Sequence, residues 1–241
     1  LAIFDFYNQV PSTSVLGTPF LFRDYEHMRA VYDSDVLADL EAEIEEKAGV
    51  KILAYPYIGA RHLGYKGDKE YMTPADLEGM KLRMPGGEGW QFVGQAMGAT
   101  PVPVAFTEVY TALQSGAIDG QDNGFPATAS MKFHEVINYI GTTSHLIAAN
   151  EFTISLDKWN SMNEEQQAKV QECADNFEAA LDASTLELEE SKRAEIEAAG
   201  VTVYAPDNAA FQEHVLGVYA DSKYSADWPE GLVEAIQAVG Q

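Results

Sequence analysis

Apolar and polar residues follow one another along most of the chain in patterns that predict short strands between helices. Residues 25–48 carry apolar side chains at helical spacing, and Gly49 follows where a glycine commonly ends a helix. We interpret residues 56–72 as a connection that contains glycine and lysine. The alternation predicts an α/β fold with mostly parallel sheets. Further helices are predicted at 89–97, 107–115, 125–140, 163–199, 207–221 and 230–238, and strands at 50–55, 81–84, 102–104, 117–120, 144–157 and 201–204.

The pattern from 163 to 199 is unusually long for a single helix. Asn163, or a capping box from Ser161 to Glu164, begins it, and neither proline nor glycine occurs before Gly200. One face is apolar, and we expect that face to be buried together with the only cysteine of the chain. A single cysteine allows neither an intrachain disulfide nor a multi-cysteine zinc site. The apolar face consists of Val170, Cys173, Phe177, Leu181 and Leu188.

The net charge of the chain disfavours some classes of binding partner. Among the 241 residues, 38 Asp and Glu stand against 15 Lys and Arg, which gives a net charge of −23 spread along the chain. Nucleic acids and anionic membrane surfaces attract clusters of Lys and Arg, so we expect neither as a partner. No run of 18 apolar residues is present to span a membrane. The chain starts at Leu1 with neither an initiator methionine nor a signal peptide, and we expect a processed or interior start.

Motifs for metal, nucleotide or nucleophile chemistry do not occur in the sequence. No two of the five histidines have a spacing typical of metal ligands, and there is no phosphate-binding loop or nucleophile elbow. We therefore expect no metal and no cofactor. Arg83, at the end of the predicted strand 81–84, is the more informative residue, because ligands bind at this end of open parallel sheets. Its guanidinium fits a ligand carboxylate held by two hydrogen bonds, and equally an internal salt bridge.

Polar and aromatic residues close to Arg83 also allow two interpretations, contact with a ligand or a purely structural role. The Gly86-Gly87 turn fits an anion-binding loop or an ordinary tight turn between a strand and a helix. The segment 119–124, rich in Asp, Asn and Gly, fits the orientation of a polar ligand or an Asx-rich turn. Phe106 and Trp90 flank these segments, and aromatic residues in such places belong more often to a core than to a ligand platform.

Six stretches, taken together in their order and spacing, resemble the periplasmic solute-binding proteins of TRAP transporters, the DctP family. The resemblance extends over essentially the whole chain. The stretches are Pro19-Phe20-Leu21-Phe22, Gly59-Ala60-Arg61-His62, Thr73 to Pro85, Met97 to Pro103, Phe106 to Gln114 and Gly116 to Asn123.

The resemblance implies a two-lobed, clamshell-like periplasmic-binding-protein fold with a long domain-spanning helix at 163–199. Lobe one is expected at residues 1–59 plus 150–188, and lobe two at 60–149 plus 189–241. Family members open with further strand and helix elements before the point that corresponds to Leu1. We therefore expect lobe one to be incomplete on its N-terminal side in this chain.

The resemblance also implies roles for individual residues. Arg83 matches the arginine that pairs with the ligand carboxylate, Asn123 a residue that hydrogen-bonds the ligand, and Phe106 an aromatic that packs on it. Arg61 falls where many members carry a second basic contact. Gly86 and Gly87 stand where many members carry polar side chains that face the ligand, which leaves room at this place.

The function implied is extracytoplasmic capture of a small organic acid anion, without catalysis, and its delivery to the membrane subunits of a TRAP-type transporter. Cleft closure around the ligand accompanies capture, and the protein is expected in the periplasm as a monomer. Two alternatives belong to other classes: an extracytoplasmic ligand-sensing domain on the same fold, and an enzyme that acts on a small acid. Against the enzyme, the sequence shows no nucleophile–base pair and no metal-ligand cluster.

Overall fold

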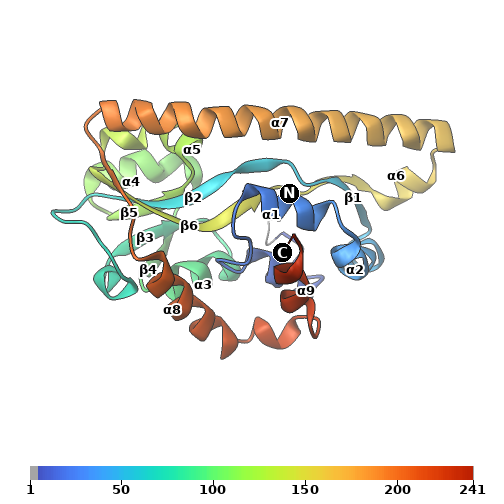
Figure 1. Ribbon diagram of the computed structural model, residues 1–241, viewed down its shortest axis with the longest axis horizontal. Helices are drawn as coiled ribbons and strands as arrows, with labels where there is room; N and C mark the ends of the chain where they lie inside the picture. Colours follow the sequence, from blue (N-terminus) through green and yellow to red (C-terminus); the bar gives the residue numbers. More distant parts are fainter. Residues whose placement is uncertain (1–4, 241) are drawn as a thin grey trace.

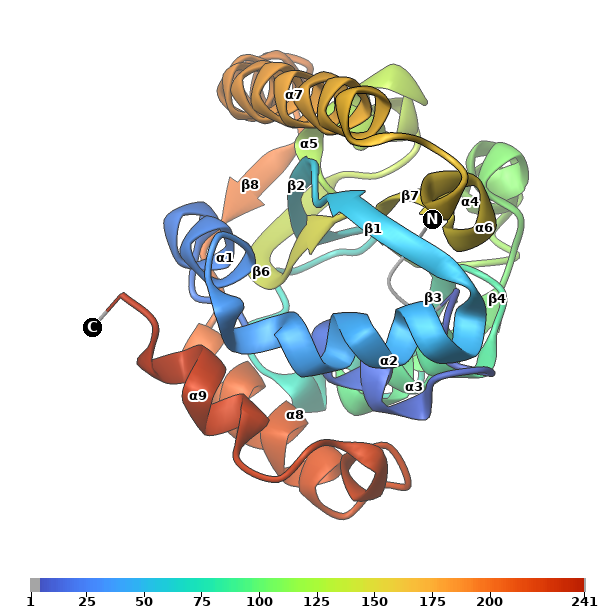
Figure 2. The same ribbon diagram turned by 90° about the vertical axis from the view of Figure 1, so that its right-hand side faces the viewer.

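Two strands and one helix run along the molecule and connect its two lobes (Figure 1). The strands are β2 (Tyr57–Tyr65) and β6 (Tyr139–Ala149), which pair with each other, and the helix is α7 (Glu164–Ala198). In both views α7 lies on one side of these strands and α8 (Asn208–Ala220) lies on the other (Figures 1 and 2). The structure is a computed structural model that describes residues 5–240.

Caps and turn residues begin and end the elements where the sequence places them. Thr73 and Asp76 form a capping box at η3 (Pro74–Leu77), and the left-handed Gly49 and Gly116 follow α2 (Ala38–Ala48) and α4 (Val109–Ser115). Asn163 begins α7 with a second capping box. The remaining elements are η1 (Pro11–Gly17), α1 (Tyr25–Tyr32), η2 (Asp35–Leu37), β1 (Val50–Ala54), β3 (Lys81–Met84), α3 (Glu88–Ala96), β4 (Thr100–Pro103), η4 (Phe106–Glu108), β5 (Gly120–Asn123), α5 (Phe125–Ser130), η5 (Phe133–Glu135), β7 (Phe152–Ser155), α6 (Leu156–Asn160), β8 (Thr202–Tyr204), η6 (Ser225–Asp227) and α9 (Leu232–Ala238).

The larger sheet has six strands in the order β4-β3-β5-β2-β6-β8. Three of its five pairings are parallel: β3 with β4, β3 with β5, and β6 with β8. The other two are antiparallel and both involve β2. A second sheet pairs β1 with β7 in antiparallel fashion. The predicted α/β architecture with mostly parallel pairings in its main sheet is therefore confirmed, with β2 as the exception.

Separate clusters of buried apolar side chains fill the lobes. One cluster joins the segment after Phe6 to α1, α2 and β1, and α9 adds Leu232 and Ile236 to it. A second cluster lies between β3, α3 and α8, and a third gathers around α4, α5 and β8. The residue limits of the two lobes stay a prediction, and their positions 1–4 and 241 lie outside the described residues.

The interpretation of residues 56–72 as a connection was wrong, because most of this segment forms β2. Two glycines, Gly59 and Gly64, interrupt its apolar pattern, and Arg61 and His62 are polar yet buried. The helix predicted at 125–140 was also too long, since α5 ends at Ser130 and β6 begins at Tyr139. Both errors concern the strands that connect the lobes, whose buried polar groups hide the usual alternation.

The buried apolar face predicted for the long helix was also wrong. Cys173 is exposed, Phe177 is 44% exposed and Leu188 is 38% exposed. The residues of α7 that are buried are Ala174, Asp182, Thr185 and Ile196.

The reason is that α7 packs on the backbone of the segment that enters β2. Asp182 accepts a hydrogen bond from the Tyr57 amide at 2.7 Å, and Thr185 donates to the Tyr57 carbonyl at 3.1 Å. Glu189 accepts from the Ala60 amide at 2.7 Å. Backbone amides and carbonyls need polar partners when they are buried, so the inner face of the helix is polar at this place.

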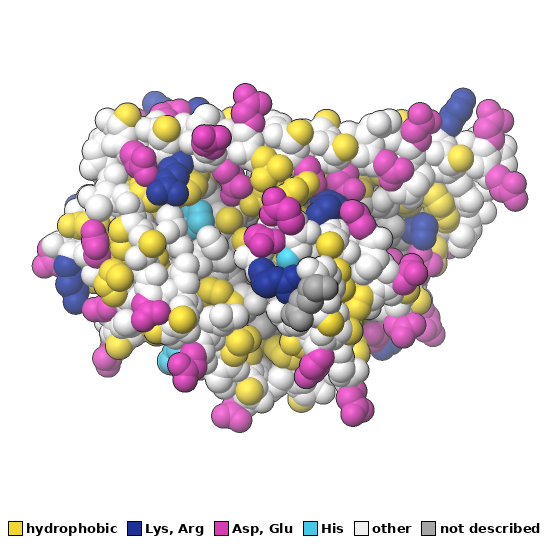
Figure 3. Space-filling model, viewed as in Figure 1, with side chains coloured by type: hydrophobic (Ala, Val, Ile, Leu, Met, Phe, Trp, Pro, Cys, Tyr) yellow, Lys and Arg dark blue, Asp and Glu magenta, His cyan; other side chains and the backbone are white. Residues whose placement is uncertain are grey.

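Acidic side chains are distributed over the face shown in Figure 3 and do not gather in one patch. Within residues 5–240, no helix combines the length and the apolar character that a membrane crossing requires.

Candidate functional site

A cavity of about 240 Å³ lies where the crossing strands meet the end of β3. It brings together four of the predicted site residues, Arg83, Asn123, Phe106 and Arg61, from four different elements. The rest of its wall is apolar apart from one asparagine at the end of β6. Those further lining residues are Ile58, Pro85, Trp90, Ala148, Ala149 and Asn150.

Arg83 is 3% exposed at the C-terminal end of β3. Its Nε donates to the Val104 carbonyl at 2.8 Å, which fixes the plane of the guanidinium, and its charge lies 5.7 Å from the centre of the Phe106 ring. No carboxylate among residues 5–240 forms an ion pair with it at 4 Å or less, and burial lowers the pKa of Arg83 to about 10. A buried cation without a paired anion is costly, and a bound carboxylate would supply that anion.

Arg61 lines the same cavity but already has an anionic partner. Its Nε donates to Asp122 Oδ2 at 2.9 Å and its Nη2 donates to Asp122 Oδ1 at 2.9 Å and to the Asp122 carbonyl at 2.6 Å. The other side of the guanidinium faces the ring of Trp90, 4.9 Å from its centre. Arg61 is therefore neutralised and held from two sides, unlike Arg83.

Asp122 is fully buried on β5. Burial opposes its ionisation, but the charge of Arg61 and the hydrogen bond from His145 outweigh burial and lower the pKa of Asp122 to about 2. His145 Nε2 lies 3.1 Å from Asp122 Oδ2, and its Nδ1 lies 2.7 Å from Thr143 Oγ1. This chain of contacts ties β2, β5 and β6 together behind the cavity wall.

The two uncharged candidates have different surroundings. The amide nitrogen of Asn123 donates to Gln121, and the side chain is 7% exposed. Phe106 is 39% exposed, and its ring meets that of Phe133 edge-on at 5.8 Å. An amide held by its nitrogen presents an oxygen that accepts hydrogen bonds, and an exposed ring offers a face for packing.

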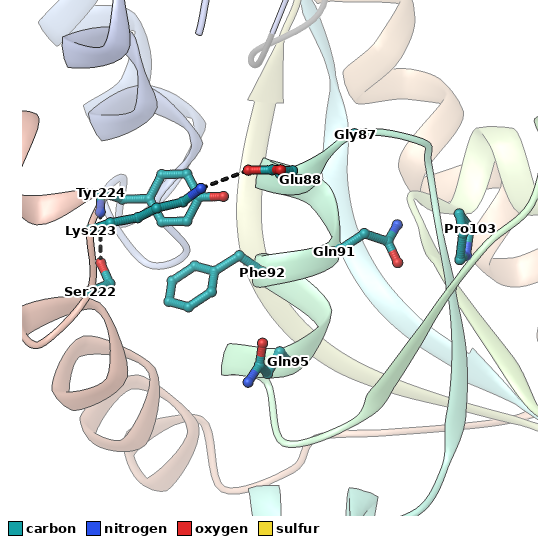
Figure 4. Close-up of a pocket in the computed structure, with 9 residues that line it drawn as sticks. All are labelled: Gly87, Glu88, Gln91, Phe92, Gln95, Pro103, Ser222, Lys223 and Tyr224. Atoms are coloured by element: carbon teal, nitrogen blue, oxygen red, sulfur yellow. Dashed lines mark hydrogen bonds and ion pairs between the residues drawn. The ribbon is translucent and has the colours of Figure 1, made fainter. Parts of the chain in front are cut away.

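Gly86 and Gly87 do not line this cavity. They line a neighbouring cavity of about 410 Å³, and Trp90 is part of the wall of both. Gly87 also borders a third, open cavity of about 550 Å³ between α3 and the segment 222–224 (Figure 4). There the Lys223 ammonium reaches across to Glu88 at 2.6 Å, at the N-terminal end of α3 (Figure 4).

Sequence reasoning missed three contributors to the site. Aromatic residues in such places belong more often to a core than to a ligand platform, but Trp90 is both buried and part of the wall of two cavities. Ile58 was hidden in the supposed connection, and Asp122 was noted only as part of a turn-like segment. The adjacency of Asp122 and Asn123 was a usable signal, because consecutive strand residues serve opposite faces of a sheet.

The chemistry of the cavity is that of holding an anion. Its described lining supplies a cation without a carboxylate partner, two amides and aromatic faces, and it contains no serine, cysteine or histidine. Within residues 5–240, no three His, Cys, Asp or Glu side chains are grouped so that they could hold a metal ion.

Comparison with known proteins identifies the family. Residues 2–225 match the model of DctP, the bacterial extracellular solute-binding protein family 7. A solved TRAP periplasmic solute-binding protein from Roseobacter denitrificans, with bound 3-deoxy-D-manno-oct-2-ulosonic acid, is 38% identical with a TM-score of 0.95. The alignment covers 99% of this chain and 79% of that one. A second from the same organism, with bound β-D-glucuronate, is 34% identical with a TM-score of 0.90 and the same coverage.

A curated solute-binding protein of Roseobacter denitrificans is 34% identical over 205 residues, which are 85% of this chain and 62% of the relative. The chain thus spans about three fifths of that relative's length. The solved structures confirm the two-lobed periplasmic-binding-protein fold with its long helix. Proteins of this family are periplasmic and bind solutes. The chain belongs to the DctP family of bacterial extracellular solute-binding proteins.

Proposed function

We propose that this protein captures a small carboxylate, most specifically a sugar acid, in the periplasm and delivers it to the membrane subunits of a TRAP-type transporter. It acts as a monomer, without a cofactor and without chemical change to the ligand. Two relatives support the ligand class, since their structures hold 3-deoxy-D-manno-oct-2-ulosonic acid and β-D-glucuronate, which share a carboxylate and several hydroxyl groups.

The observation that carries this proposal is that Arg83 is buried and has no carboxylate partner among residues 5–240. The other arginine of the cavity wall, Arg61, is already paired with Asp122. The Arg83 guanidinium is fixed by one bond to Val104 and has lost its hydration to burial. A carboxylate that accepts two parallel hydrogen bonds from it restores a partner to the charge in a single geometry.

The neighbours of Arg83 fit the rest of a sugar acid. The Asn123 oxygen would accept a hydrogen bond from a hydroxyl, and the exposed face of Phe106 would pack on carbon atoms of the ligand. Arg61 would contribute through the part of its guanidinium that Asp122 does not engage. Ile58 and Ala149 give the opposite wall its apolar character.

Capture is proposed to work by closure of the two lobes. The cavity has walls from β2 and the end of β6 on one side and from β3, α3 and η4 on the other. A ligand that contacts both walls only in the closed conformation stabilises that conformation. The net charge of −23 repels an anion at long range, so attraction by Arg83 acts within about 8 Å, the screening length at physiological salt.

Calorimetry with sugar acids tests this function. Arg83→Ala should weaken binding by about 30-fold to several thousand-fold, the cost of removing one partner of a buried charge pair. Arg83→Lys should fail as well, because an ammonium does not donate two parallel bonds to a carboxylate. Arg193→Ala is the matched control, since Arg193 is exposed and pairs with Glu197 on the surface of α7.

Affinity of the Arg83→Lys variant within threefold of the original would contradict the two-bond geometry. Stabilisation by neutral sugars with no response to any organic acid in a thermal-shift panel would contradict the ligand class. Recovery of a chemically altered ligand after incubation would contradict binding without catalysis.

A further inference from the structure

A cavity of about 450 Å³, which we call the α7 cavity, lies between β2 and α7, with further walls from α5 and β6. Consecutive residues of a strand point to opposite faces of its sheet. Arg61 accordingly lines the cavity of Arg83, whereas Ala60 and His62 line the α7 cavity. The two cavities have no described lining residue in common. The volume of the α7 cavity lies within the roughly 300–1,000 Å³ typical of small-molecule sites.

A bulge of β6 forms part of the wall of the α7 cavity. The register of β2 against β6 shifts here, so that residues 142–145 of β6 lie opposite the single residue His62. Ser144, within the bulge, has a φ of +45°, a conformation that residues other than glycine seldom adopt. Bulges and strained residues occur more often beside functional sites than elsewhere, which makes this cavity a candidate for binding.

His62 supplies a hydrogen-bond donor that has no acceptor. Its side chain is 5% exposed, and its ring packs on that of Phe125 with 4.6 Å between the ring centres. The Ser144 amide donates to Nδ1 of His62 at 3.3 Å, which places the ring proton on Nε2. Within residues 5–240 no group accepts a hydrogen bond from Nε2, and His62 lines the cavity. The buried end of the cavity therefore requires an acceptor oxygen.

The ring of His62 stays neutral. Burial, together with the charges of His145 and Arg193, lowers the pKa of His62 to about 3. A neutral imidazole with its proton on Nε2 donates one hydrogen bond into the cavity and carries no charge that would attract an anion.

The outer wall of the cavity, on α7, is acidic. Glu189 and Glu190 both line it, and Glu189 already accepts a hydrogen bond from the Ala60 amide at 2.7 Å. Glu190 is exposed and forms no ion pair of 4 Å or less within residues 5–240. Arg193 also borders the cavity, but its Nε donates to Glu197 at 3.0 Å. The outer end therefore favours a cation and disfavours an anion.

From this arrangement we infer that the α7 cavity is a second binding site, for a small hydroxylated amine whose oxygen accepts a hydrogen bond from His62 and whose ammonium group lies beside Glu190. The ring of Phe125 and the methyl group of Ala60 pack on carbon atoms of the ligand. An amino sugar combines these groups in one ring. The inference goes beyond the proposed function and does not depend on it, because the carboxylate cavity lies on the other face of β2.

Three pyranoses that differ in charge provide the test: D-glucosamine, D-glucose and D-glucuronate. Calorimetry near pH 6, where the amine is protonated, is performed on the Arg83→Ala variant, so that the carboxylate cavity does not contribute. D-Glucosamine should bind roughly fivefold more tightly than D-glucose, which corresponds to one exposed charge pair. D-Glucuronate should show no measurable binding to this variant, because its carboxylate would face Glu189 and Glu190.

Glu190→Gln in the same background should remove the advantage of D-glucosamine over D-glucose. Glu172→Gln is the matched control, since Glu172 is an exposed glutamate of α7 outside the cavity. A readout at His62 requires no substitution in the core. The NMR signal of its Nε2 should shift on addition of D-glucosamine and stay unchanged on addition of D-glucuronate.

Equal affinity for the three pyranoses, or a preference for D-glucuronate, would overturn the inference. An unchanged preference in Glu190→Gln, or binding of D-glucosamine without a shift at His62, would overturn it as well. Failure of D-glucosamine to bind would overturn it and leave the proposed function standing. Failure of every sugar acid to bind the protein with Arg83 intact would instead overturn the proposed function alone.

Discussion

Two arginines, the partly buried Arg29 and the buried Arg83, differ in whether the fold supplies an anion to their charge. Arg29, on α1, lies under α7, where its Nη1 donates to Glu178 and its Nη2 donates to Asp182, each at 2.7 Å. Arg83, in the cavity, has a backbone carbonyl as its hydrogen-bond partner and no ion pair within residues 5–240.

The pKa shifts of the two guanidinium groups show the difference in physical terms. Burial acts to lower the pKa of Arg29, but the charges of Glu178 and Asp182 outweigh it and raise that pKa above its usual value. At Arg83 burial prevails, although Asp122 opposes it, and the pKa falls to about 10. A paired buried charge belongs to the architecture, whereas a buried charge that the fold leaves uncompensated marks the place for a ligand.

The largest effect expected from this comparison is at Arg29. Arg29→Met should lower the free energy of unfolding by about 3–5 kcal/mol, because it leaves Glu178 and Asp182 without their cation. Urea denaturation of the ligand-free protein measures this change. A loss below about 1 kcal/mol would mean that the ion pairs between Arg29 and α7 contribute little to the free energy of unfolding. Arg29 and Arg83 would then not differ in their contribution to stability.

An intermediate effect is expected at the pair between Asp122 and Arg61. The folded pKa of Asp122, about 2, lies below its ordinary value, so the stability that its charge contributes is present above about pH 4 and is lost as the pH falls through 2. Asp122→Asn should therefore cost roughly 2 kcal/mol at pH 7 and progressively less in acid. Unfolding curves from pH 7 to pH 2 provide the measurement, and a difference that stays constant over this range would contradict the role of the charge.

The smallest effect on stability is expected at Arg83, although its effect on binding is large. Arg83→Met removes a buried charge without a partner, so the unfolding free energy of the ligand-free protein should stay the same or rise by about 1 kcal/mol. The same substitution thus has opposite consequences at Arg29 and at Arg83. A marked loss of stability in Arg83→Met would show that Arg83 is part of the architecture after all.

Local signals in the sequence predicted the elements with caps and clear periods well. Gly49 marked a helix end and Asn163 a helix start, and Arg83 was placed at the end of its strand. The partner of Arg61 was not predictable in this way. It depends on the register of β2 against β5, which sets Leu63 opposite Asp122 and so brings Arg61 diagonally beside it.

The prediction for the inner face of α7 failed for a related reason. Periodicity identified the spacing of Val170, Phe177 and Leu188 but not what the helix packs against. Backbone groups of another segment demand polar side chains, and only the assembled fold shows that such a segment lies there. Sequence patterns therefore specified local elements, while the pairing of charges across elements came from the three-dimensional arrangement.

Attachment of the crossing segment to α7 determines which of its backbone torsion angles are free to change. The amides of Tyr55, Tyr57 and Ala60 donate to Glu178, Asp182 and Glu189 of the helix. Only Ile58 and Gly59 lie between the last two attachment points. The register of β2 against β6 shifts between Tyr57 and Gly59, and Gly59 has a φ of +112°. On this strand, a rotation confined to these two residues breaks none of the bonds to α7. Because Ile58 also forms part of the cavity wall, a molecule in the cavity would contact the short stretch of β2 that lies between two attachment points to α7.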